Sequence, residues 1–144
     1  MPIAPVVLVV DDEEAFAQTL SKRLELRGFK SRSVTSGPEA LALLDTEPVD
    51  LIILDVLMPE MSGPEALLKI KEKYPLIPVL MLTGEATVER AIDGMKAGAL
   101  DFLMKPCDIG VITEKLQQAY RRKCEHEERI KDAEISHLIN RKGW

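Results

Sequence analysis

Cysteine is scarce in this sequence, and long apolar runs are missing altogether. The 144 residues include two cysteines, Cys107 and Cys124, with neither pairing nor metal-ligand spacing, which speaks against a disulfide-rich scaffold and a cysteine-bound zinc site. No apolar run approaches the roughly 20 residues that span a bilayer. The opening residues, MPIAPVVLVVDD, lack the basic segment that begins a secretory signal. We therefore expect free thiols, no membrane-spanning helix and a cytoplasmic protein.

Acidic side chains outnumber basic ones in residues 1–120. The net charge is −5, but residues 121–144 hold 7 basic and 5 acidic side chains, which leaves −7 for residues 1–120. Because an acidic surface repels phosphate backbones, we expect no direct nucleic-acid binding by residues 1–120. Hydrophobic residues at 46% and charged residues at 30% are typical of a folded domain that buries its own core.

Strand-like runs alternate with helical patterns over most of the chain. The predicted strands at 6–10 and 51–55 are apolar throughout, except for Asp55 at the end of the second, which is typical of strands buried on both faces of a parallel sheet. Weaker or shorter runs predict strands at 30–34, 78–83 and 101–104. Between them, apolar residues at helical spacing, with Ser, Pro and Gly at the ends, predict helices. Their ranges are 14–27, 36–44, about 64–74, 87–96, and a last helix that begins near Asp108 or Thr113 and faces inward with Val111, Ile112, Leu116 and Tyr120.

Five repeats of strand then helix predict one fold class. Connections of this length join parallel strands by right-handed crossovers and place helices on both faces of the sheet. We therefore predict an α/β, flavodoxin-like doubly wound domain with strand order 2-1-3-4-5 and five helices. In this order, ligands bind beyond the carboxyl ends of the strands, where strands one and three are neighbours.

Polar residues stand at the carboxyl ends of four predicted strands: Asp11 and Asp12, Asp55, Thr83, and Lys105. Neighbouring strands lie about 4.8 Å apart, so carboxylates at the ends of strands one and three repel unless a cation or a shared proton relieves them. Carboxylate oxygens and water are ligands suited to Mg²⁺, which usually bridges to a phosphate. The sequence therefore predicts a magnesium site at this edge.

Each of these residues has a simpler explanation when taken alone. Asp11 or Asp12 can cap the following helix, Asp55 can be an ordinary turn residue, Thr83 can be a loop or cap hydroxyl, and Lys105 can be a solvated charge. Together they form a set suited to phosphoryl transfer. A carboxylate such as Asp55 can attack phosphorus where magnesium and a lysine neutralise the phosphoryl oxygens, and a hydroxyl such as Thr83 can then bind one of them.

The motifs VLVVDDEEAF, LIILDVLMPEMSGPE, VLMLTGEA and GALDFLMKP resemble those of response-regulator receiver domains over about residues 5–122. The resemblance implies that Asp55 is the phosphoacceptor and that a histidine kinase or phosphotransfer protein is the donor. It also implies that Mg²⁺ is held by Asp12, Asp55 and the backbone carbonyl of Leu57, with Asp11 assisting without binding the ion directly.

The same resemblance assigns the parts of a switch. Thr83 would be the switch hydroxyl, Lys105 the phosphate-pairing lysine, and Phe102 the switch aromatic, although an aromatic on a sheet strand is usually just core. The peptide bond between Lys105 and Pro106 would be cis. Phosphorylation would then change the surface formed by helix four, strand five and helix five.

Two positions border the expected path of an attacking water. Leu57 stands two residues after the acceptor, where many receivers carry a polar residue, and Glu85 stands two residues after Thr83. Our hypothesis is that Leu57 slows self-hydrolysis of the phosphoryl group because it disfavours an in-line water.

We divide the chain into a receiver domain at 1–122 and a charged helical extension at 123–144. Opposite charges four residues apart, and the lack of Pro and Gly before Gly143, predict a helix that continues from helix five. Three uses of the extension remain open: a dimer or partner helix, a linker to an output domain, and a solvated tail. Its apolar residues do not sustain heptads, namely Cys124, Ile130, Ile135, Leu138 and Ile139.

Two other functions are compatible with parts of the sequence. A magnesium-dependent phosphatase or phosphotransferase acting on small molecules through Asp55 would need a second acid two residues on, where Leu57 stands. A phosphorylation-independent binding domain would not account for the three acids at the strand ends, Asp11, Asp12 and Asp55. We therefore expect no enzyme activity beyond self-catalysed phosphotransfer and dephosphorylation, and an output partner that the sequence does not name.

Overall fold

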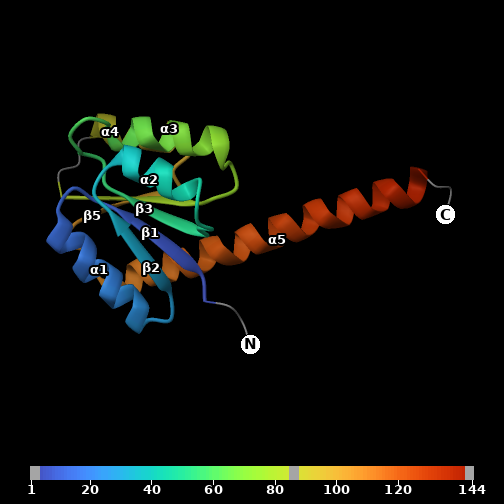
Figure 1. Ribbon diagram of the computed structural model, residues 1–144, viewed down its shortest axis with the longest axis horizontal. Coiled ribbons are helices and arrows are strands. Elements are labelled where there is room, and N and C mark those ends of the chain that lie inside the picture. Colours follow the sequence, from blue (N-terminus) through green and yellow to red (C-terminus); the bar gives the residue numbers. More distant parts are fainter. Residues whose placement is uncertain (1–3, 85–87, 142–144) are drawn as a thin grey trace.

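The computed structural model describes residues 4–84 and 88–141 (Figure 1). Five parallel strands form one sheet in the order β2-β1-β3-β4-β5, and this confirms the predicted fold class and strand order. The elements follow one another as β1 (Val6–Val10), α1 (Glu14–Leu26), β2 (Lys30–Val34), α2 (Gly37–Leu44), β3 (Leu51–Leu54), α3 (Gly63–Lys73), β4 (Val79–Thr83), α4 (Val88–Lys96), β5 (Asp101–Met104) and α5 (Ile109–Arg141).

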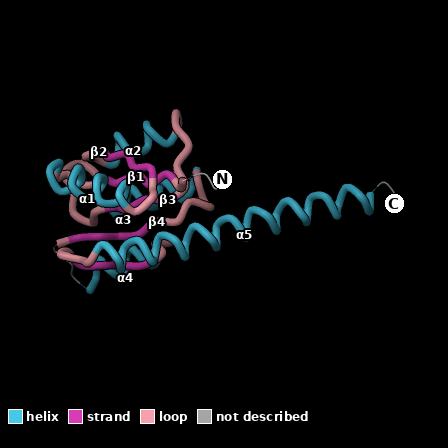
Figure 2. Tube along the Cα trace, turned by 90° about the horizontal axis from the view of Figure 1, so that it is seen from below, coloured by secondary structure: helices cyan, strands magenta, loops and turns pink. Residues whose placement is uncertain are grey.

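The sheet lies between two layers of helices, with α2, α3 and α4 on one face and α1 and α5 on the other (Figures 1 and 2). Each face has its own apolar core because successive side chains of a strand point to opposite sides. Along β1, Leu8 and Val10 join the core under α2 and α3, while Val7 and Val9 join the core under α1 and α5. This explains why the central strands are apolar at every position.

Local signals in the sequence set the ends of several helices. The hydroxyls of Ser36 and Ser62 accept hydrogen bonds from the backbone N–H groups of Glu39 and Glu65 at 3.2 and 3.3 Å, and Pro occupies the first turn of both helices. Gly28 follows α1 with a φ of +94°, the left-handed conformation that a glycine adopts without a steric penalty.

The inward face of α5 differs from the prediction at one position. Ile112 and Leu116 are buried and Tyr120 is half-buried, as expected, but Val111 is 41% exposed. The buried face continues through Ala119, so Val111 lies about 100° away from Ile112 around the helix axis. The prediction for Val111 was therefore wrong, because an apolar side chain near a helix start does not by itself mark the core face.

The predicted extension is helical and continuous with α5 as far as Arg141 (Figure 2). Lys123 anchors its first turn: the ammonium lies 3.5 Å from Asp50, just before β3, and 2.8 Å from Glu127. Asp50 also accepts a hydrogen bond from the N–H of Val6 at 2.9 Å, so the helix leaves the body at the amino ends of β1 and β3. Beyond this point the helix projects away from the sheet (Figure 1).

Both cysteines are free thiols, as predicted, with Cys107 half-buried and Cys124 exposed. Across 4–84 and 88–141, no helix combines the length and the apolar composition needed to cross a bilayer.

Gly63 sets how closely α3 approaches the loop after β3. A Cβ at this position would lie 2.3 Å from the carbonyl oxygen of Asp55 and 2.7 Å from the Cα of Val56. The N–H of Gly63 also donates to the carbonyl of Val56 at 2.8 Å. Because both obstacles are backbone atoms, no side-chain rotation relieves the clash.

We predict that Gly63→Ala lowers the free energy of unfolding by about 2 to 3 kcal/mol, measured by urea denaturation. Gly94→Ala is the matched control, since a Cβ there meets only Met81 side-chain atoms at 3.6 Å or more. It should be neutral or stabilise by up to about 1 kcal/mol, as alanine favours the helix. Equal stability of the two variants would contradict this close packing.

Candidate functional site

The sheet itself brings the predicted site residues together. Asp11 follows β1, Asp55 follows β3, Thr83 ends β4 and Lys105 follows β5. The ladder of backbone hydrogen bonds continues beyond the strands, because the N–H of Asp55 donates to Val10 at 2.9 Å and the N–H of Lys105 donates to Thr83 at 2.8 Å. The positions of these Cα atoms are therefore fixed by the sheet and not by a free loop.

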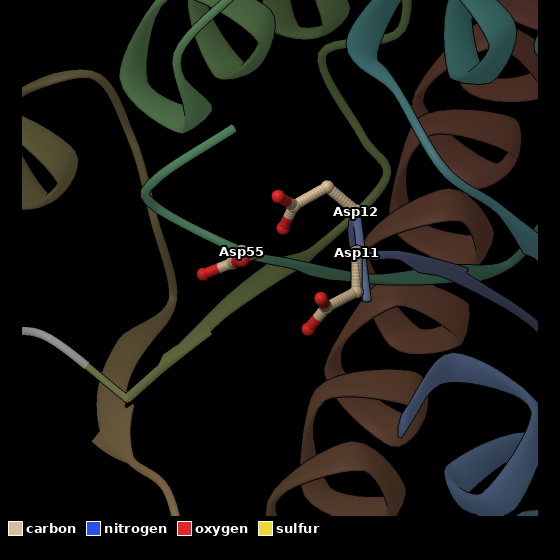
Figure 3. A group of neighbouring side chains, drawn as sticks. All are labelled: Asp11, Asp12 and Asp55. Atoms are coloured by element: carbon tan, nitrogen blue, oxygen red, sulfur yellow. The ribbon is translucent and has the colours of Figure 1, made fainter. Parts of the chain in front are cut away.

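Three carboxylates gather at this edge. One oxygen from each of Asp11, Asp12 and Asp55 lies within 4.8 Å of the others, and Figure 3 shows the three side chains pointing to a common region. Asp11 is 2% exposed and Asp55 is 5% exposed, whereas Asp12 is open to solvent. Like charges at this distance and depth repel strongly, so the site favours a cation or a proton.

Lys105 supplies positive charge, and it does so beside Asp11. Its ammonium lies 2.6 Å from one oxygen of Asp11 and 3.8 Å from Glu13, and its side chain is only 12% exposed. The second oxygen of Asp11 accepts the N–H of Glu13 at 2.9 Å. Both oxygens of Asp11 therefore have partners within the chain, and the ion pair holds Lys105 at the site.

Asp55 is the carboxyl group whose titration changes most clearly. Burial raises the pKa of Asp55 to about 6, and the charge of Asp11 contributes to the rise. The positive charge of Lys105 and hydrogen bonds from Thr83 and the N–H of Leu57 act in the opposite direction, the last at 3.4 Å. Near neutral pH the side chain is thus an ionised but poorly compensated carboxylate, which is suited to accept a cation or an electrophile.

The donor set fits magnesium. It consists of carboxylate oxygens, one of them on the open side chain of Asp12, so that water can complete the coordination of a hard cation. Neither Asp11 nor Asp12 is the N-cap residue of α1. That residue is Glu13, whose side chain makes no capping hydrogen bond, although its N–H donates to Asp11. The assignment of the Leu57 carbonyl as a ligand stays a prediction.

The remaining predicted positions are placed as follows. Phe102 is half-buried on β5 and packs against the core under α2 and α3, so its contacts match those of an ordinary core aromatic, and its switch role stays a prediction. The peptide bond between Lys105 and Pro106 is cis, as predicted. Glu85 lies outside the described residues.

Sequence reasoning missed Phe16 as a neighbour of the site. The ammonium of Lys105 lies over its ring, 4.0 Å from the centroid. In the sequence, the helical spacing of Phe16 with Leu20 and Leu24 indicates only a core-facing side chain of the first helix. The available signal was its position in the first turn of that helix, five residues after Asp11, where a side chain begins at the edge of the site.

Comparisons with known proteins agree with this geometry. Residues 7–117 match the family model described as the response regulator receiver domain. The transcriptional regulatory protein ZraR of Salmonella typhimurium is 40% identical over 113 residues, which are 78% of this chain and 26% of that protein. The probable transcriptional regulatory protein TcrX of Mycobacterium tuberculosis is 37% identical over 116 residues, 81% of this chain and 50% of that protein.

A solved structure gives the same result. The CheY-like receiver domain protein from Methanospirillum hungatei superposes with a TM-score of 0.82 at 28% identity, covering 85% of this chain and 98% of that one. The chain spans about a quarter to a half of the length of the two curated relatives. Family model, relatives and fold agree, and the chain belongs to the response-regulator receiver domain family.

Proposed function

We propose that this receiver accepts a phosphoryl group on Asp55 from a histidine kinase or a phosphotransfer protein and thereby switches a protein-interaction surface. The observation that carries the proposal is the buried carboxylate of Asp55, crowded by Asp11 and Asp12 and facing the edge where Lys105 is held. A cytoplasmic location is part of the proposal.

The chemistry is a displacement at phosphorus. A carboxylate oxygen of Asp55 forms the new bond to phosphorus while the bond to the donor atom breaks, and the donor leaves with its electron pair. Lys105 would pair with the phosphoryl oxygens, and Thr83 would donate its hydroxyl hydrogen to one of them. The domain itself would thus supply the groups for its phosphorylation and for later hydrolysis, with no other enzyme activity.

Magnesium would be held by Asp12, Asp55 and the backbone carbonyl of Leu57, with Asp11 assisting from behind. When bound, it would neutralise charge on the phosphoryl oxygens. The chain's own contribution is the fixed separation of the carboxylates, which the sheet register sets.

The output surface of this proposal is the face formed by α4, β5 and α5. Large apolar side chains stand exposed on all three elements: Ile92, Met95, Met104 and Val111. The hydrogen bond of Thr83 with an arriving phosphoryl oxygen, followed by inward movement of Phe102, would change this face. The output partner is a protein that the sequence does not name. A second copy of the chain could also bind, either through this face or through the α5 extension.

The two alternative functions predict different chemistry. A small-molecule phosphatase would turn over substrate, whereas Leu57 stands where such an enzyme needs a second acid. A phosphorylation-independent binding domain would show no magnesium affinity, and the three carboxylates within 4.8 Å of one another argue against it.

Incubation with magnesium and acetyl phosphate should add one phosphoryl group to the wild type and none to Asp55→Asn. The reason is that Asn lacks the nucleophilic oxygen while keeping the shape of the side chain. Intact mass spectrometry measures the addition. Asp45→Asn is the matched control, since Asp45 is an exposed residue after α2 that pairs with Lys73, and it should be phosphorylated like the wild type. No addition to the wild type, together with absent magnesium binding, would favour the binding domain.

The raised pKa of Asp55 makes stability depend on pH. A carboxyl group whose pKa rises from 3.8 to about 6 on folding contributes fully below pH 3.8, and its contribution is lost as the pH rises through 6. We therefore predict that the stability gained by Asp55→Asn grows between pH 4 and pH 7, by up to about 3 kcal/mol.

Urea unfolding of both proteins across this pH range measures the difference, and magnesium should reduce it at pH 7 by compensating the ionised carboxylate. A difference that does not change with pH would show that the burial of Asp55 is not the controlling effect.

Leu57→Asn should shorten the half-life of the phosphorylated protein by about tenfold, because the amide can orient a water in line with the phosphorus. In the wild type, Leu57 is half-buried and packs against the core, and its apolar side chain cannot hydrogen-bond a water. The half-life is read by intact mass after removal of the donor. Leu68→Asn, on the exposed face of α3, is the control. An unchanged or longer half-life in Leu57→Asn defeats the hypothesis.

A further inference from the structure

The ring of Phe16 lies beside the charge of Lys105. It lies in the first turn of α1, and the ammonium of Lys105 stands 4.0 Å from the centre of its ring. The face of an aromatic ring carries partial negative charge and attracts a cation at this distance. The attraction is larger here than on an open surface, because the lysine side chain is 12% exposed.

The contacts of Lys105 divide into two kinds. Asp11 accepts one of its N–H groups at 2.6 Å, and Glu13 lies at 3.8 Å on the solvent side. The ring of Phe16 attracts the same ammonium without accepting a conventional hydrogen bond. Because an ammonium has three N–H donors, donors remain for phosphoryl oxygens.

We propose that Phe16 is a positioning residue for phosphoryl transfer: together with Asp11, its ring holds the ammonium of Lys105 in one orientation while leaving N–H donors for the incoming phosphoryl oxygens. This inference rests on the proposed phosphorylation of Asp55. The ion pair with Asp11 fixes one side of the ammonium, but the flexible four-carbon stem of a lysine lets the remaining N–H donors turn towards water unless a second contact restrains them. Pre-orientation of a charged group before the reaction lowers the barrier.

Packing alone gives the competing explanation, since Phe16 is half-buried and contacts the core under α1 and α5. The two explanations are separable because the ring borders a hollow of about 220 Å³ that is also lined by Leu20, Pro106 and Cys107. Side chains of somewhat different shape can therefore replace the ring without displacing neighbouring backbone.

The test compares Phe16→Leu, which removes the ring but stays apolar, with Phe16→Tyr, which keeps it. In magnesium and acetyl phosphate, Phe16→Leu should be phosphorylated about fivefold more slowly, and Phe16→Tyr should remain within about twofold of the wild type. Phe29→Leu is the matched control: Phe29 is buried in the same core but precedes β2, at the other end of the sheet. It should lose stability and keep the wild-type rate.

A second measurement needs no magnesium and no donor. In the wild type and in Phe16→Tyr, the ring should shift the NMR signals of the Lys105 ε-methylene protons upfield, and this shift should vanish in Phe16→Leu. Thermal unfolding of each variant verifies that it is folded. If Phe16→Leu is unfolded, Phe16→Met takes its place with the same expectations.

The outcomes separate the two proposals. No phosphorylation of the wild type overturns the proposed function and this role with it. Normal phosphorylation of the wild type, with an equal rate in Phe16→Leu, overturns only the role of Phe16. A slower rate in both Phe16→Leu and Phe16→Tyr, with the ring-current shift retained in Phe16→Tyr, shows that packing and not the ring is responsible.

Discussion

Repulsion between buried carboxylates is the constraint on which this domain is built. The parallel register places Val10 beside Leu54, so the acids that follow, Asp11 and Asp55, must be neighbours at one edge of the sheet. Neither is released to solvent, because backbone hydrogen bonds continue from the strands into both residues. Lys105 compensates Asp11, but the raised pKa of Asp55 shows that this carboxylate keeps an unfavourable charge, which a bound cation or a proton would relieve.

Rigid neighbours keep this arrangement from relaxing. Gly63 lets the start of α3 lie against the backbone of Asp55 and Val56. The ion pair of Lys105 with Asp11 fixes the position of the second buried carboxylate. The two apolar cores then fix the sheet from both faces. The electrostatic repulsion is therefore confined to the edge of the sheet where the carboxylates lie. The apolar packing around it is that of an ordinary doubly wound domain.

Much of the fold follows from patterns that are local in the sequence. Continuous apolar runs identified the central strands, and Ser36 with Pro38 identified the start of α2, since each depends on neighbouring residues only. The convergence of the strand-end residues was also predictable, because strand order fixes which carboxyl ends meet. The face of α5 was misjudged at Val111, and the Phe16 contact with Lys105 was missed, because both depend on how distant segments pack.

Helix α5 joins the two ends of the domain in one piece. It begins four residues after Lys105, passes the anchor at Lys123 and continues to Arg141 without a break. From Lys123 onward it extends about 27 Å, given a rise of about 1.5 Å per residue. In mechanical terms it is a lever with a short arm beside the edge where the three carboxylates gather and a long arm outside the body. A tilt of about 10° at the anchor would carry its far end through roughly 5 Å, so small rearrangements near Lys105 are enlarged at a distance.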